Sequence, residues 1–289
     1  MEKDLTLPSG ACDCHVHVIG PFEQYPMVGD RHYTPGPASV KALTEHLAKT
    51  GLSRAVIIQP SVYGTDNTCL LDCLDALGDA GRGIAVVAQD ATDQELQALS
   101  ARGVRGLRVN VESASLQDGK ALGRTLFDWA ERVAALNWHL QVYASLNTLA
   151  VAVPFLAKLP VPVVLDHFAM VPGSSSDTDV RLAAVLQLVR AGQAYVKLSA
   201  PYRLGSADVD SGAAAARLAA LFLKANPERV LWGSDWPHTN REAGKLAHEV
   251  SAYRSFPSGS LLQDLSSWLP ESQLLQHVLV DNPARLYRF

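Results

Sequence analysis

The chain has 289 residues, of which 48% are hydrophobic and 19% are charged. This composition excludes a disordered or fibrous protein, and no apolar stretch reaches the roughly 18 residues of a membrane span. The net charge is −4 and basic residues form no run, which argues against nucleic-acid binding. The start, Met-Glu-Lys-Asp-Leu, lacks the basic and apolar regions of a signal peptide, so we expect a cytoplasmic protein.

Short β-branched segments alternate with amphipathic ones along the whole chain. Strands are predicted at 11–19, 54–59, 83–88, 104–111, 139–144, 161–165, 194–198 and 230–233. Helices are predicted at 39–50, 67–80, 93–101, 122–136, 146–159, 178–191, 212–225 and 241–255, with more helix at 261–268, 271–279 and 282–287.

Eight strand–helix units predict an α/β fold, a (β/α)8 TIM barrel with extra C-terminal helices, formed by a single domain over residues 1–289. An open doubly wound sheet is the alternative. It is disfavoured because no G-x-G-x-x-G follows any strand. In such a barrel the active site forms at the carboxyl ends of the strands, so polar residues there are the candidates for function.

The four cysteines do not have the spacing of a zinc ribbon. They are Cys12 and Cys14 on the first strand, and Cys69 and Cys73 four residues apart in a predicted helix. We expect small, buried, reduced thiols and no structural disulfide.

The first strand carries Asp13, His15 and His17 at alternate positions. A period of two predicts that they share one face of the strand, toward the barrel axis. Two imidazoles inside a barrel are costly without partners, which favours a functional role for the pair. Asp235 follows the eighth predicted strand, and His167 follows the sixth together with Asp166.

Arginines form a second group of candidates. Arg108 lies within an otherwise apolar strand, where an unpaired charge would be expensive, so we expect it to bind an anion. Arg105 has the opposite parity, and at most one of the two points into the barrel. Arg102 precedes this strand and Arg203 follows the seventh; both are candidates for carboxylate binding.

The motifs on the first, sixth and eighth strands resemble those of the amidohydrolase superfamily, in its amidohydrolase-2 branch. They are Asp-x-His-x-His at 13–17, Leu-Asp-His at 165–167 and Gly-Ser-Asp-Trp-Pro-His at 233–238. Segments at 33–35, 58–61, 64–67 and 103–108 narrow the similarity to the 2-pyrone-4,6-dicarboxylate lactonases of that branch. The similarity runs from about Ala11 to Phe289.

The resemblance implies a hydrolase that opens a dicarboxylate lactone during bacterial breakdown of lignin-derived aromatic compounds. We expect Asp235 to be the general base that activates water. His15, His17 and His167 would hydrogen-bond the lactone carbonyl and the oxyanion. The expected substrate-binding residues are Arg108, Arg203, Arg102, Tyr33, Ser61 and Tyr143.

Metal-dependent members of the superfamily usually add a histidine at the end of strand five. Here that strand ends at Tyr143, which leaves only His15, His17 and Asp235 as ligands for zinc. We therefore expect no cofactor, as in the lactonases that the chain resembles, and keep a divalent metal as the alternative.

Three other functions remain open. They are a metal-dependent hydrolase or decarboxylase, a sugar-acid lactonase or isomerase, and a non-catalytic barrel that binds dicarboxylates. The expected partner is a small-molecule lactone, with no nucleic acid and no membrane, and a homo-oligomer is left open.

Overall fold

The computed structural model describes residues 6–110, 118–205, 209–257, 259–269 and 271–289. One sheet has the strand order β1-β3-β4-β5-β6-β7-β8-β9, and its paired strands run parallel. The strands are β1 (Cys12–Val16), β3 (Arg54–Ile58), β4 (Gly81–Ala85), β5 (Val104–Asn110), β6 (His139–Tyr143), β7 (Val163–Leu165), β8 (Ala194–Ser199) and β9 (Val230–Gly233). The predicted (β/α)8 TIM barrel is confirmed. Val111, predicted as the end of β5, lies outside the described residues.

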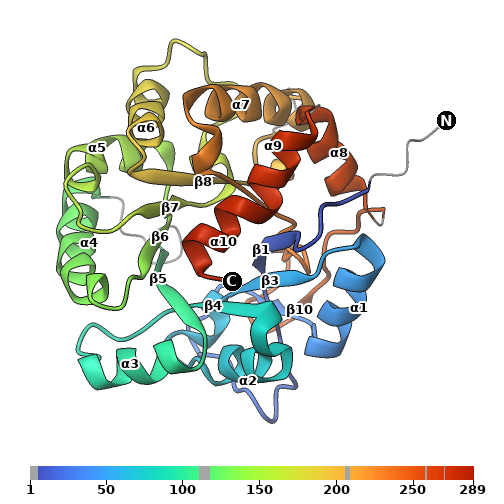
Figure 1. Cartoon of the computed structure of the whole chain (residues 1–289). Coiled ribbons are helices and arrows are strands. Elements are labelled where there is room, and N and C mark those ends of the chain that lie inside the picture. The colour runs from blue at the N-terminus through green and yellow to red at the C-terminus, as the bar shows by residue number, and fades with distance from the viewer. Residues whose placement is uncertain (1–5, 111–117, 206–208, 258, 270) are drawn as a thin grey trace. The chain divides into compact units, whose positions relative to one another are not determined.

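The chain divides into two compact units, Met1–Val87 with Trp232–Phe289, and Ala88–Leu231. The first contains β1, β3 and β4 with α1 (Val40–Thr50), α2 (Thr68–Leu77), α8 (Ser260–Trp268), α9 (Ser272–Gln276) and α10 (Asn282–Tyr287). The second contains β5 to β8 with α3 (Asp93–Ala101), α4 (Gly119–Ala134), α5 (Leu146–Leu156), α6 (Val180–Arg190) and α7 (Ser211–Ala225), and its helices flank the strands (Figure 1). A single domain over the whole chain stays a prediction.

Helix starts and buried faces follow from local sequence. Ser39 caps α1 by accepting from the Ala42 backbone N–H, and Thr92 forms a capping box with Glu95 at the start of α3. Several helices then bury residues three or four apart, as α1 does with Leu43 and Leu47 and α6 with Leu182, Val185 and Leu188. No helix in the described ranges is long and apolar enough to cross a bilayer.

The end of β9 returns to β1 within the first unit. The Asp235 N–H donates to the His15 carbonyl at 3.0 Å, and the His17 N–H donates to the Trp236 carbonyl at 2.8 Å. A Cβ at Gly233 would lie 2.6 Å from the Cβ of His15, so only glycine allows this approach. The backbone thereby fixes His15 and His17 beside Asp235.

The helix predicted at 241–255 is wrong. This segment contains turns and β10 (Val250–Ser251), which pairs in parallel with β2 (Thr34–Pro35). Gly244 has φ +83°, a left-handed conformation that interrupts a helix. The Ala252 N–H donates to the Glu242 carboxylate, so a side chain satisfies a backbone donor in place of a helical carbonyl. After β9 the next helix among the described residues is α8.

Candidate active site

Two histidines and one aspartate meet in the first unit. The Nε2 atoms of His15 and His17 lie 3.5 and 3.7 Å from Oδ1 of Asp235. His15 and Asp235 are fully buried and His17 is 6% exposed. One ligand atom from each of the three lies within 4.8 Å of the others. The structure therefore brings together the three residues that the sequence offered as metal ligands or as base and hydrogen-bond donors.

The protonation of His17 is constrained by a backbone carbonyl. Its Nδ1 lies 2.8 Å from the carbonyl oxygen of Ile58, an acceptor, so Nδ1 carries the proton. A neutral His17 then presents the Nε2 lone pair to the site, and only an imidazolium can donate a hydrogen bond there. This arrangement is the one that metal-ligating histidines commonly have, so the donor set fits a divalent cation.

Asp235 has a strained backbone. Its φ is +62°, in the left-handed region that costs a non-glycine residue on the order of 1 kcal/mol or more. Such strain persists where surrounding contacts impose it and is frequent at active sites. Here the bonds of its backbone N–H to His15 and of its carbonyl to the His238 N–H hold the residue in place.

Asp13 does not share the face of the two histidines, which corrects the expectation from a period of two. The pairing of β1 with β3 shifts register between Asp13 and Val16, so β1 carries one extra residue there. The Asp13 carboxylate instead lies 3.8 Å from Nε2 of His46 on α1. A bulge of this kind changes the direction of a side chain relative to its neighbours.

A second polar group is centred on Asp166 in the second unit. Its Oδ2 accepts from Gln141 Nε2 at 3.1 Å and from Arg108 Nη2 at 3.4 Å. Its Oδ1 lies 3.6 Å from Lys197 Nζ, which also donates to Gln141 Oε1 at 2.7 Å. All four side chains are buried, and two cations share this carboxylate. Arg108 is held in one orientation, which suits bidentate binding of an anion.

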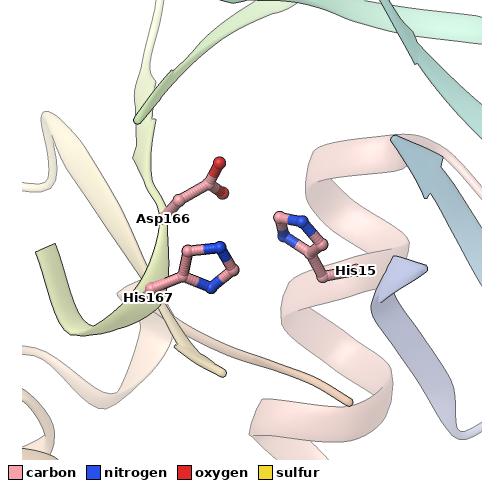
Figure 2. A group of neighbouring side chains, drawn as sticks. All are labelled: His15, Asp166 and His167. Atoms are coloured by element: carbon pink, nitrogen blue, oxygen red, sulfur yellow. The ribbon is translucent and has the colours of Figure 1, made fainter. Parts of the chain in front are cut away.

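His167 follows Asp166 at the end of β7, and Figure 2 shows the two as successive side chains. Residues 167–170 all have φ near +50°, a left-handed turn that sets the direction of the His167 ring. The ring Nδ1 lies 2.8 Å from Ser199 Oγ, and Tyr143 packs edge-on against it at 5.3 Å between centroids. The Arg108 guanidinium lies over the Tyr143 ring, 5.6 Å from its centroid.

Of the other predicted site residues, Ser61 and Arg203 follow strand ends, whereas Tyr33 and Arg102 precede strands. Ser61 begins a 3-10 turn after β3, and Arg203 ends one after β8. Tyr33 is half-buried and precedes β2. Arg102 is exposed at the C-cap of α3, before the first residue of β5, whereas Arg108 lies near the far end of that strand.

Arg105 and Arg108 on β5 have different partners, as their opposite parity predicts. Arg105 donates to the Ser100 and Val104 carbonyls, while Arg108 contacts Asp166.

Sequence reasoning missed Gln141, Lys197 and Ser199. Each is part of a predicted strand or follows one. A signal was present, because Gln141 and Tyr143 alternate with apolar residues on β6, as Lys197 and Ser199 do on β8.

Comparisons with known proteins identify the family of the chain. The family model for amidohydrolases matches residues 12–289, so the chain belongs to the amidohydrolase family. The 2-pyrone-4,6-dicarboxylate hydrolase of Comamonas testosteroni is 35% identical over 99% of this chain and 92% of its own length. The 4-sulfomuconolactone hydrolase of Hydrogenophaga intermedia is 29% identical over 97% and 89%. The D-galactarolactone isomerase of Agrobacterium fabrum is 28% identical over 97% and 92%.

Among solved structures, the probable 2-pyrone-4,6-dicarboxylic acid hydrolase of Acinetobacter baumannii, with citric acid bound, has a TM-score of 0.78 at 27% identity. The match covers 97% of this chain and all of that one. The expected resemblance to the lactonases of the amidohydrolase-2 branch is confirmed.

Proposed function

We propose that this chain is a lactone hydrolase whose substrate is 2-pyrone-4,6-dicarboxylate or a close dicarboxylate lactone. The observation that carries the proposal is the buried Asp235 carboxylate with the His15 and His17 imidazoles beside it. The relative from Comamonas supports the substrate, since it is 35% identical over almost the whole of both chains. The sulfomuconolactone hydrolase supports the wider class of anionic lactones.

In this reaction Asp235 accepts a proton from water, and the water oxygen attacks the lactone carbonyl. The carbonyl oxygen becomes an oxyanion, and hydrogen-bond donors lower the energy of that charge. The ring C–O bond then breaks, and the leaving ring oxygen takes the proton held by Asp235 to become a hydroxyl group. The new carboxylic acid releases its proton to solvent and becomes a carboxylate. His15, His17 and His167 are the proposed partners of the carbonyl and oxyanion.

Cationic side chains are the proposed partners of the two substrate carboxylates. Arg108 is buried in the Asp166 group, and the guanidinium fork matches a carboxylate. Arg203 after β8 is the second candidate, and Arg102 stays a weaker one because of its exposed position. Tyr33, Ser61 and Tyr143 would donate further hydrogen bonds. The Acinetobacter relative, which holds the tricarboxylate citric acid, supports a pocket for such anions.

A divalent metal would be held by His15, His17 and Asp235. When bound, it would supply a Lewis acid that polarises the lactone carbonyl. Without it, His17 has to be an imidazolium to donate a hydrogen bond, since its Nδ1–H is committed to the Ile58 carbonyl. A metal-free role of His17 as a donor therefore requires an imidazolium beside the Asp235 carboxylate.

The test is the loss of 2-pyrone-4,6-dicarboxylate absorbance on addition of purified protein, with and without a strong chelator. Loss in both samples supports a metal-free lactonase, and loss only without chelator supports a metal-dependent one. Absence of loss in both, with turnover of D-galactarolactone, would replace the proposal by a sugar-lactone activity. Saturable binding of the pyrone without any turnover would instead indicate a binding protein.

A further inference from the structure

Asp13 is a fully buried carboxylate that the proposed chemistry does not use. Its Oδ1 accepts the backbone N–H of His15 at 3.1 Å and the backbone N–H of Ser234 at 2.9 Å. Asp13 Oδ1 thus links β1 to the residues after β9. One donor belongs to His15, and the other belongs to Ser234, the neighbour of Asp235. We call this linked region the β1–β9 junction. The hydrogen bond from the Asp235 N–H to the His15 carbonyl closes the same junction.

The second oxygen of Asp13 faces His46. Oδ2 lies 3.8 Å from His46 Nε2, and within the described part of the chain neither atom has a hydrogen-bond partner. The His46 ring stacks on Trp236, with centroids 5.7 Å apart and an interplanar angle of 27°. Trp236 in turn accepts the His17 backbone N–H. His46 therefore contacts the β1–β9 junction in two ways, through the Asp13 carboxylate and through the Trp236 ring.

We propose that Asp13 is a positioning residue for the reaction and that His46 on α1 holds it in place. A carboxylate buried for packing alone would be costly, because its desolvation is not repaid by apolar neighbours. Asp13 instead accepts the backbone N–H groups of His15 and Ser234, where β1 and the segment after β9 position His15 and Asp235. Displacing these residues by about 1 Å is expected to cost on the order of 10²-fold in rate. The kinetic part of this inference rests on the proposed function.

A cavity beside His46 makes the proposal testable by chemical rescue. It has a volume of about 310 Å³, and its lining includes His46, Trp236 and His238. Truncation of His46 to alanine removes the ring and enlarges this cavity. Free imidazole can then occupy the vacated position and restore a donor for Oδ2 of Asp13.

The experiment compares His46→Ala with and without imidazole. We expect kcat to fall about 10-fold or more with KM within about twofold, and imidazole to restore at least half of the lost rate. His248→Ala is the matched control, because His248 is exposed and belongs to the same unit. Neither that variant nor the unmodified protein should respond to imidazole. A normal kcat in His46→Ala, or a loss that imidazole does not reverse, would overturn the role of His46.

Asp13→Asn and Asp13→Ala test the carboxylate itself. Asparagine keeps an acceptor for both N–H groups, whereas alanine leaves them without one, so kcat should fall much further in Asp13→Ala. Amide hydrogen exchange of residues 230–238 provides a readout without substrate. It should accelerate at Ser234 and Asp235 in Asp13→Ala and stay close to normal in Asp13→Asn. Unchanged exchange in Asp13→Ala would overturn the inference even if the lactone is not the substrate. Accelerated exchange in a protein that leaves the pyrone intact would refute the proposed function alone.

Discussion

His17 Nε2 lies 3.7 Å from Oδ1 of Asp235, and both side chains are buried. The backbone carbonyl of Ile58 fixes which ring nitrogen of His17 faces the carboxylate. The end of β3 thus orients His17 through Ile58, and the backbone bond from the Asp235 N–H to the His15 carbonyl positions Asp235. Substitution of Asp235 is therefore the most direct test of the proposed chemistry.

Asp235→Asn should abolish turnover while substrate binding remains measurable. Asparagine has nearly the same shape but cannot accept a proton from water, so kcat is expected to fall about 10²–10⁴-fold. Single-turnover kinetics and calorimetric titration with the lactone would measure the two effects separately. Retained turnover would remove Asp235 from the role of base. A loss of binding equal to the loss of rate would point to a structural defect.

Arg108→Met should chiefly weaken substrate binding. Methionine keeps much of the apolar stem but loses the guanidinium that would bind a carboxylate. Since a hydrogen bond to a charged group contributes about 1.5–3 kcal/mol, KM should rise about 10–100-fold. Arg105→Met is the matched control, because Arg105 lies on the same strand and donates to backbone carbonyls of Ser100 and Val104. An unchanged KM in Arg108→Met would refute the carboxylate assignment.

His139 should make the protein less stable as the pH falls. Burial, together with the nearby Lys197 charge, lowers the pKa of His139 to about 3, whereas an unfolded histidine has a pKa of about 6.5. Between these values the unfolded chain binds a proton that the folded chain does not. The free energy of unfolding should therefore decrease as the pH falls below about 6.5, by up to about 1.4 kcal/mol per pH unit from this residue.

Urea unfolding at several pH values between 4 and 7.5 would measure this slope. His139→Gln should have a shallower slope than the unmodified protein over this range, even if it is less stable throughout. His248→Ala should keep the original slope, because His248 is exposed. Parallel slopes for His139→Gln and the unmodified protein would contradict the assignment.

The cysteines should be unreactive in the folded protein. All four are buried free thiols, and burial raises the pKa of Cys73 to about 12 and also raises those of Cys69 and Cys12. Because the thiolate is the nucleophile, alkylation by iodoacetamide at pH 8 should be very slow. Mass spectrometry should detect four modified thiols only after denaturation. Rapid modification of the native protein at any of these positions would contradict the buried assignment.

Much of the fold could be predicted because it depends on local periodicity. The boundaries of α3, α10 and β9 agree with those expected from sequence, and the other barrel strands overlap their predictions. The helix predicted at 241–255 was wrong because the apolar spacing of this segment resembles that of a helix. Gly244 and the Glu242 side chain instead stabilise turns.

The sequence by itself determined which residues stand at strand ends, and hence the candidates His15, His17, Asp235 and Arg108. Tertiary structure decided how they are oriented. The extra residue in β1 turns Asp13 toward α1, and it arises from pairing with β3. The partners of Asp166 come from β5, β6 and β8, through Arg108, Gln141 and Lys197. A repeating pattern records the face on which a side chain lies. It does not record which atom from a strand tens of residues away will satisfy a buried charge, because that depends on how the strands pack together.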